Sequence, residues 1–422
     1  MPNAVHPRVD SISPRRARWR ALAGALLGAT AIAGCARESA SSGTSTPPRA
    51  AVRAGTGPTD PDGTRPALEE RDPSAPRHAK PPRLVLAFGG DVIAHDALRV
   101  AAARADHRDA AGRSLNDSGY GALIAAIAPA VRGADLAFAN LESPVTPREL
   151  RRGEMIFHAD EPLLAAVARA GFHVVSVANN HALDQGRGGL ADTLAAANRH
   201  GLVAVGAGET MRDACAPRVA TRSGIAIAVL ARTLVMNFRD PPERGSPSVC
   251  MLAEGPLKRQ AREARAAGAD VVIASLHWGN EYDRAPRREQ IDAAHRLVEA
   301  GVDLVIGHHP HVLQRVERVP KRDGRSALVA YSLGNLLSNQ GYAFDPRTGK
   351  QADGDTRDAA VLRVVVARRD DGAVEIADAA AVPLWTDHSA GGDITLVPAT
   401  TRRARIGERL QIPLVDASVA RR

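Results

Sequence analysis

The chain has 422 residues, of which 44% are hydrophobic, so it can form one large domain or two small ones with a sizeable core. Only 3% of the residues are aromatic, so aliphatic side chains must build most of that core. The formal net charge is +8, but the basic residues are spread out rather than gathered in long runs, which argues against nucleic acid as a partner.

The first 35 residues have the pattern of a lipoprotein signal peptide. A basic stretch, residues 15–20 (RRARWR), precedes an apolar segment, residues 21–34, that is shorter than the ~20 residues of a membrane-spanning helix. The end of this segment, Ile-Ala-Gly followed by Cys35, resembles a bacterial lipobox. That resemblance implies lipidation of Cys35 and an extracytoplasmic, membrane-anchored protein. A plain cleaved signal or an uncleaved anchor is the alternative.

Residues 36–82 are rich in Ser, Thr, Pro, Gly, Ala and charged residues, with almost no large apolar side chain. Such a segment buries too little surface to offset its ordering entropy, so we predict a disordered tether. At ~5–6 Å × √n its span is roughly 35–40 Å. The folded domain is predicted over residues 83–390, and the order of the tail, residues 391–422, is left open.

Within the folded region, short apolar runs alternate with longer Ala- and Arg-rich stretches. Strands are predicted at residues 84–88, 135–140, 173–179, 202–206, 225–231, 270–276, 303–307 and 327–333. Helices are predicted at 119–132, 161–170, 188–200, 256–267 and 286–300. Strands that are apolar along their whole length indicate burial on both faces, and the alternation favours parallel βαβ units. Residues 360–384 instead indicate antiparallel strands joined at Asp371-Gly372.

The other two cysteines of the chain, Cys215 and Cys250, allow two interpretations. In an oxidising compartment they could form a disulfide, and otherwise they are two buried free thiols. The sequence does not decide between them.

Polar residues follow directly after six of the predicted strands. They are Asp91, then Asn140 and Glu142, then Asn179, Asn180, His181 and Asp184, then His277, then His308, His309 and His311, and finally Asn335. Because ligands of open α/β sheets bind outside the carboxyl ends of strands, these residues are expected to converge. Each motif alone has an ordinary explanation as a turn, a cap or a core histidine.

The segment His309-Pro310-His311 is a stronger signal, because alternate residues of an extended segment point the same way and paired imidazoles are typical metal ligands. Carboxylate and amide oxygens combined with imidazoles, and no thiolate, suit Mn, Fe or Zn. Two such ions ~3.5–4 Å apart can clamp a phosphate and activate water. The sequence therefore predicts a site for one or two divalent metal ions.

Six motifs, in this order, resemble the capsule-synthesis protein family that includes CapA. They are GGDVIAHD, FANLESPVT, SVANNHALDQG, LHWGNEY, VIGHHPHVLQ and AYSLGNLL. The resemblance covers residues 84–337 and implies a role in poly-γ-glutamate capsule synthesis. The family is similar to calcineurin-like metallophosphoesterases, which implies a four-layer α/β/β/α sandwich.

The resemblance also implies roles for individual residues. The metal ligands would be Asp91, Glu142, Asn180, His277, His309 and His311, with Glu142 in the place of a bridging Asp. His181 and Asp184 would be catalytic, with His181 as general acid or phosphate contact, and Asn140 and Asn335 would bind substrate.

Two departures from the metallophosphoesterase pattern bear on the number of ions. The pattern opens with Asp-x-His, whereas Asp91 is followed by Val92 and Ile93, and His95 lies too far along to be taken as a substitute. Glu142 also replaces an aspartate. The site could therefore hold one ion, two in altered geometry, or none.

Two functions fit these observations. The first is a metal-dependent hydrolase or transferase acting on a phosphate ester or on an amide of a surface polymer such as poly-γ-glutamate. The second is a non-catalytic accessory subunit that binds or exports an anionic polymer together with a membrane synthase. Four arginines near the motifs could meet an anionic substrate, namely Arg151, Arg152, Arg187 and Arg284.

Overall fold

The computed structural model describes residues 82–105, 108, 114–238, 246–345, 347, 351–388 and 392–417. The predicted signal peptide with Cys35, and the predicted tether up to residue 81, lie outside the described residues. Within the described ranges, no helix is long and apolar enough to cross a membrane.

The first of two large sheets has the strand order β16-β15-β14-β1-β2-β3-β4, with β13 paired to the end of β1. The strands β1 to β4 are parallel to one another, and β14, β15 and β16 extend the sheet in antiparallel fashion. Their bounds are β1 Arg83–Val92, β2 Leu136–Leu141, β3 Val174–Ser176, β4 Val203–Val205, β13 Asn335–Leu337, β14 Asp358–Arg368, β15 Val374–His388 and β16 Ile394–Pro398.

The second sheet has the order β11-β12-β10-β9-β7-β6. Its four inner strands are parallel, as predicted, and β6 and β11 close its edges in antiparallel fashion. Their bounds are β6 Arg218–Arg222, β7 Ile225–Thr233, β9 Val271–His277, β10 Leu304–His308, β11 Val316–Pro320 and β12 Ser326–Ala330. Two short strands, β5 Ala207–Gly208 and β8 Ser248–Val249, form a separate antiparallel pair.

Alternate residues of β7 show how the sheets are packed. Ile227 and Val229 join the large core that contains Leu86 and Phe88 of β1, whereas Leu230 joins a second core under the helices. Because successive side chains of a strand point to opposite faces, a strand buried on both faces must be apolar throughout. This accounts for the continuous apolar runs of the sequence.

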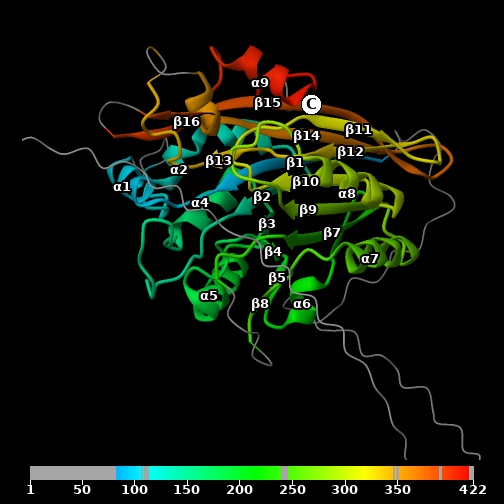
Figure 1. The fold of residues 1–422 in the computed structure, drawn as a ribbon, viewed down its shortest axis with the longest axis horizontal. Coiled ribbons are helices and arrows are strands. Elements are labelled where there is room, and N and C mark those ends of the chain that lie inside the picture. The colour runs from blue at the N-terminus through cyan, green and yellow to red at the C-terminus, as the bar shows by residue number, and fades with distance from the viewer. Residues whose placement is uncertain are drawn as a thin grey trace, which may run out of the picture. The chain divides into compact units, whose positions relative to one another are not determined.

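Helices cover the outer faces of the two sheets. Figure 1 shows α7 and α8 on one side of the strands and α1, α4 and α5 on the other. The helix bounds are α1 Asp96–Arg104, α2 Tyr120–Leu123, α3 Ala128–Val131, α4 Pro162–Ala170, α5 Gly186–Arg199, α6 Met211–Cys215, α7 Glu254–Ala266, α8 Arg288–Glu299 and α9 Arg403–Leu410, with 3-10 turns at Ala125–Ile127 and Gln351–Arg357. The α/β class and the α/β/β/α layer order are confirmed.

Local departures from the predicted elements have physical reasons. The helix predicted over 119–132 is divided into α2, a 3-10 turn and α3, and Pro129, which lacks a backbone N–H, stands in the first turn of α3. The hairpin at Asp371-Gly372 is confirmed, and Gly372 has a φ of +86°. The tail, whose order was left open, contributes β16 and α9, and α9 buries Ile406 and Leu410.

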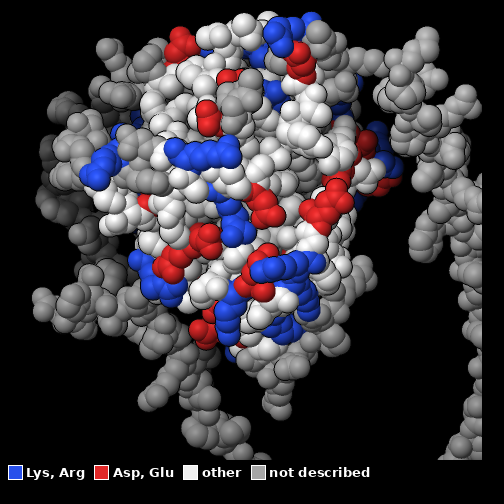
Figure 2. Space-filling view, turned by 90° about the vertical axis from the view of Figure 1, so that its left-hand side faces the viewer, with Lys and Arg blue, Asp and Glu red and all other residues white. Residues whose placement is uncertain are grey.

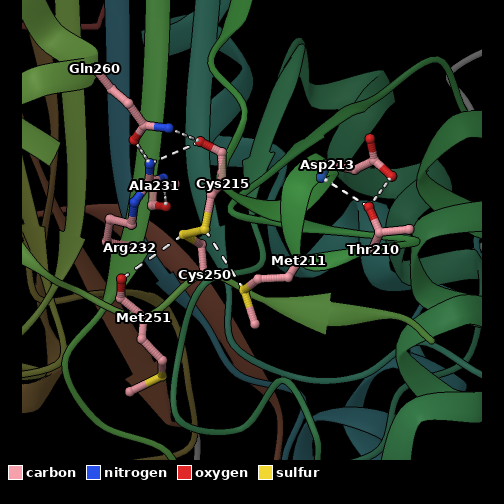
Figure 3. Close-up of a disulfide and its surroundings, with 9 residues drawn as sticks. All are labelled: Thr210, Met211, Asp213, Cys215, Ala231, Arg232, Cys250, Met251 and Gln260. Atoms are coloured by element: carbon pink, nitrogen blue, oxygen red, sulfur yellow. Dashed lines mark hydrogen bonds between the residues drawn. A yellow bond between two sulfur atoms is a disulfide. The ribbon is translucent and has the colours of Figure 1, made fainter. Parts of the chain in front are cut away.

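A disulfide links Cys215, at the end of α6, to Cys250, just after β8 (Figure 3). The two residues are 35 positions apart, with their Cα atoms 5.1 Å from each other. Gln260 Nε2 and Arg232 Nη2 both donate to the carbonyl oxygen of Cys215 at 2.9 Å. Of the two interpretations of these cysteines, the structure has the disulfide.

Candidate metal centre

The polar residues predicted to converge do so at the carboxyl ends of the parallel strands. Asp91 lies near the end of β1 and Glu142 directly after β2, while His277 and His308 end β9 and β10. Asn180 and His181 follow β3, and Asn335 begins β13. All of these side chains are buried. We call Asp91, Glu142, His277, His309 and His311 the strand-end cluster.

Asp91 is surrounded by nitrogen atoms. Its Oδ1 atom lies 2.9 Å from Asn140 Nδ2 and 3.1 Å from His308 Nδ1. Its Oδ2 atom lies 3.1 Å from His311 Nδ1. Burial alone would raise the pKa of the Asp91 carboxyl, but hydrogen bonds and attraction from His308 and His311 bring that pKa well below its ordinary value. Asp91 is therefore an ionised carboxylate among imidazoles.

Asn140 lies inside the cluster and holds two carboxylates together. Its Nδ2 atom donates to Asp91 Oδ1 and, at 3.2 Å, to Glu142 Oε2. Asn179 fixes the orientation of this amide by donating to Asn140 Oδ1 at 3.1 Å and to the carbonyl of Leu141 at 2.8 Å. The predicted substrate contact of Asn140 would have to be made from this buried position.

His277 approaches the cluster from the second sheet. Its Nε2 atom lies 2.8 Å from Asn180 Oδ1 and 3.5 Å from Glu142 Oε1. Burial, and then repulsion from His309, lower the pKa of His277 well below its ordinary value. The ring is therefore neutral near pH 7, which is the form that binds a metal ion.

The cluster fits a divalent metal ion by its donor atoms. Two groups, Glu142-His309-His311 and Asp91-Glu142-His277, each place their ligand atoms within 4.8 Å of one another, and Glu142 belongs to both. Among the described residues, Glu142 Oε1 and His309 Nδ1 have no hydrogen-bond partner. Leaving a buried polar atom unpaired costs about 1–3 kcal/mol, a cost that a bound cation would remove. Two carboxylates with imidazoles suit Mn, Fe or Zn.

Glu142 is the least satisfied member of the cluster. Burial, and then repulsion from Asp91, raise its pKa well above the ordinary value. A nearby cation would reverse this effect by stabilising the carboxylate. Glu142 is also the residue that the two groups of possible donors share.

The turn that carries His309 and His311 differs from the sequence prediction. The prediction of an extended segment is wrong, because β10 ends at His308 and both residues have positive φ values, +95° and +58°. The two rings nevertheless lie near each other, with centroids 5.9 Å apart. The imidazoles are brought together by a left-handed turn rather than by strand alternation, an uncommon backbone for residues other than glycine.

His181 and Asp184 form a buried pair beside the cluster. His181 Nδ1 lies 2.7 Å from Asp184 Oδ2, which also accepts the backbone N–H of Phe157 at 2.7 Å. The Phe157 ring lies against His181, with centroids 4.1 Å apart. Asn237 reaches the same place, with its Nδ2 atom 3.3 Å from Nδ1 and 3.4 Å from Nε2 of the His181 ring. The carboxylate and Phe157 hold the imidazole in one orientation.

Three residues support the site although the sequence assigned no individual role to them. His308 stands in one of the six family motifs. In an extended segment its side chain would point away from His309, so the sequence did not indicate its contact with Asp91. Asn179 could have been found from the sequence, because it stands next to Asn180 in the same motif. Asn237 follows β7 in a segment with no motif, and only the structure brings it to Asn180, whose amide donates to Asn237 Oδ1 at 3.2 Å.

The position that would carry a histidine in the metallophosphoesterase pattern holds Ile93, which is buried and apolar. His95 does not reach Asp91, because its Nδ1 atom accepts the backbone N–H of Asn339 at 3.3 Å. Burial lowers the pKa of His95 to about 4. The imidazole nitrogens that contact Asp91 are instead His308 Nδ1 and His311 Nδ1, each at 3.1 Å.

Of the other predicted substrate residues, Asn335 contacts the strand-end cluster, while three of the arginines contact groups outside it. Asn335 Oδ1 is 3.1 Å from His311 Nδ1, and Arg151 donates to the carbonyl of Leu183 at 3.0 Å. Arg152 pairs with Glu149 at 2.9 Å, and Arg187 donates to the carbonyl of Pro247. On the face shown in Figure 2, basic and acidic side chains lie next to one another rather than as one basic stripe.

The chain matches a known protein family over its folded region. The sequence pattern of the family described as bacterial capsule synthesis protein PGA_cap matches residues 85–340. This range contains every member of the strand-end cluster and ends before β14.

Similar proteins carry related names. The capsule biosynthesis protein CapA of Bacillus anthracis is 32% identical over 224 residues, which is 51% of this chain and 53% of that protein. The PGA biosynthesis protein CapA of Bacillus subtilis (strain 168) is 29% identical over 255 residues, 59% and 62% of the two chains. A probable polyglutamine synthesis accessory protein of Mycobacterium tuberculosis is 30% identical over 219 residues, 49% and 56%. The chain thus spans less than two thirds of each relative.

Among solved structures, the NAD nucleotidase of Haemophilus influenzae aligns with a TM-score of 0.43 and 12% identity, over 80% of this chain and 65% of that one. A putative 5′-nucleotidase from Staphylococcus aureus aligns with a TM-score of 0.43 and 14% identity, over 72% and 55% of the two chains.

Proposed function

We propose that this chain, which belongs to the bacterial capsule synthesis protein PGA_cap family, is an extracytoplasmic metal-dependent hydrolase or transferase acting on an anionic surface polymer of the poly-γ-glutamate class. The observation that carries the proposal is Glu142, a buried carboxylate shared by two groups of metal-type donors, with one oxygen that has no partner among the described residues. A module that only binds a polymer has no need of this arrangement.

The proposed location rests on two features. The sequence pattern ending at Cys35 favours export and a lipid anchor in the membrane. The disulfide between Cys215 and Cys250 favours an oxidising compartment, since such bonds are rare where cellular thiols are kept reduced. Synthase or export proteins in the same membrane are the expected partners.

When bound, a divalent cation at the strand-end cluster would polarise a phosphoryl or carbonyl oxygen and lower the pKa of water. The residues of the chain perform the other tasks. Asp91 and Glu142 supply negative charge, and Asn140 bridges the two carboxylates by donating to both. The His277 ring is held in one orientation, because its Nε2 atom contacts Asn180 Oδ1 at 2.8 Å and its Nδ1 atom lies 3.4 Å from Asn140 Nδ2.

His181 is the proposed general acid. Because Asp184 accepts from Nδ1, the proton exchanged with a leaving group would be the one on Nε2. Phe157 packs on the His181 ring and donates its backbone N–H to Asp184, so both side chains are held in place.

A second candidate is a non-catalytic accessory subunit that binds or exports the polymer with a membrane synthase. Ile93 favours it, because an apolar side chain occupies the place of the second ligand of the first motif. The name of the mycobacterial relative, an accessory protein, also supports it.

One experiment separates the two candidates. The purified chain is assayed for bound Mn, Fe and Zn and for turnover of phosphodiester and γ-glutamyl substrates, with His277→Ala and, as control, His295→Ala. His295 is a half-exposed histidine of α8 that pairs with Glu317 at 3.0 Å and is not a member of the strand-end cluster. The enzyme proposal expects His277→Ala to lose both metal and turnover while His295→Ala keeps them. Bound metal without turnover would leave the accessory candidate, and no bound metal in the wild type would overturn the metal centre.

A further inference from the structure

A second concentration of charge lies outside the strand-end cluster, in a cavity of about 580 Å³ between α9, the segment after β9 and the start of β11. Arg284, Arg315, Arg405 and Arg409 line it, and the one acidic residue among its described lining is Glu408. We call these four arginines with their cavity the arginine pocket. Helix α9 lies beyond residue 340, where the family match ends.

The spacing of α9 creates one wall of the pocket. Arg405 and Arg409 are four residues apart, so they share a face of the helix, while Ile406 and Leu410 bury the adjacent face against the sheet. The helix is thus held by its apolar side and presents two guanidinium groups to the cavity.

Two buried aspartates hold the arginines of the pocket. Asp355 pairs with Arg284 at 2.6 Å, with Arg409 at 3.4 Å and also with Arg405. Asp358 pairs with Arg405 at 3.3 Å. The guanidinium groups also repel one another: burial, and then repulsion from Arg409 and Arg284, lower the pKa of Arg405. An anion entering the cavity would relieve this repulsion.

The pocket is joined to the strand-end cluster by two short paths. Tyr282 donates its backbone N–H to the carbonyl of Pro310 at 2.8 Å, two residues before Arg284, and its half-exposed ring lies 6.2 Å from that of His311. On the other path, Asn335 Nδ2 donates at 3.0 Å to the carbonyl of Thr356, the neighbour of Asp355. A chain with repeated anionic groups could engage both places at once.

We propose that the arginine pocket is a separate subsite for a carboxylate or phosphate group of an anionic chain whose reacting part sits at the strand-end cluster. This rests on the proposed function for the identity of the chain, but the subsite itself rests on the four arginines. Guanidinium groups bind both kinds of oxyanion through paired N–H donors.

The test is equilibrium binding of a fluorescent oligomer of γ-linked glutamate to the whole chain, followed by anisotropy. Arg405→Gln and Arg409→Gln are each expected to weaken binding about ten-fold, the loss of one charge-assisted contact. Arg315→Gln is the safeguard against misfolding, because Arg315 pairs with Glu317 and not with Asp355. The matched control is Arg288→Gln, an exposed arginine of α8 paired with Asp292.

Unlabelled competitors separate the two sources of the oxyanion. Displacement by γ-linked oligoglutamate at a lower concentration than by inorganic phosphate assigns a carboxylate chain, and the reverse assigns a phosphoester; either supports the subsite. Wild-type affinity in Arg405→Gln and Arg315→Gln would overturn it. His277→Ala leaves the arginine pocket unchanged, so it tests the proposed function separately. If His277→Ala loses metal and turnover while every arginine variant binds the oligomer normally, the subsite is refuted and the proposed function stands. If the arginine variants bind weakly while His277→Ala keeps wild-type metal and turnover, the subsite stands and the proposed function is refuted.

Discussion

The strand-end cluster and the arginine pocket both gather charged groups, but burial acts on them in opposite ways. In the cluster, two carboxylates are buried beside His277 and His309, whose pKa values are lowered by burial, so these two rings carry little positive charge near pH 7. In the pocket, three partly exposed arginines pair with the buried Asp355, and one of them, Arg405, also pairs with the buried Asp358. The strand-end cluster therefore suits a bound cation, and the arginine pocket suits a bound anion.

The largest effect is expected from Glu142→Gln on metal binding. The change keeps the shape of the side chain but removes the charge that both donor groups share. Loss of a supporting residue typically lowers metal affinity by about 10–100-fold, so loss of this ligand should exceed that range. Metal titration of wild type and variant measures it. An unchanged affinity would show that Glu142 is a buried structural acid.

The next effect is a pH dependence that belongs to His309 in the metal-free protein. Burial lowers the pKa of His309 to about 4 from an ordinary 6.5, so between these values the unfolded chain binds more protons than the folded one. Its contribution to stability is therefore complete above pH 6.5 and is lost as the pH falls toward 4, on the order of 3 kcal/mol in total. Urea unfolding at pH 7 and pH 4.5 should show a smaller loss for His309→Gln than for wild type. Equal losses in both proteins would refute it.

The same chemical change should destabilise one place and stabilise the other. Asp355→Asn leaves three arginines without their common carboxylate and is expected to lower the free energy of unfolding by about 2 kcal/mol. Asp292→Asn, in an exposed pair with Arg288, is the control and should change it by less than about 0.5 kcal/mol.

The smallest effect has the opposite sign. In the metal-free protein, Glu142→Gln removes a buried carboxylate whose pKa is raised by burial and by Asp91, so the free energy of unfolding should rise, on the order of 1 kcal/mol. Urea unfolding in the presence of a chelator measures it. If Glu142→Gln instead lowers the free energy of unfolding as much as Asp355→Asn does, burial does not act in opposite ways on the strand-end cluster and the arginine pocket.

The sequence predicted the layers and the convergence because these depend on local patterns. Apolar runs such as residues 225–231 indicate strands buried on both faces, and a polar residue after each run marks the same edge of a sheet. The carboxylates and imidazoles of the cluster could therefore be named from the sequence.

What could not be predicted depends on contacts between distant segments. Asn237 has no motif, and its place beside His181 is set by the path of the chain after β7. The orientation of His309 and His311 follows from a turn rather than from a strand. The arginine pocket needs α9 beside the segment that carries Arg284, and a separation of more than a hundred residues leaves no local sign of that contact.

The left-handed backbone of His309 and His311 offers a way to sort relatives by their sequences alone. Such a conformation costs roughly 1–2 kcal/mol per residue for a side chain with a Cβ atom, a cost that glycine avoids. A chain freed from holding an ion would gain stability by replacing either histidine with glycine. Glycine at these positions in a related sequence would thus mark a member that has given up the metal, and histidine at both would mark one that still tolerates the strain to keep it.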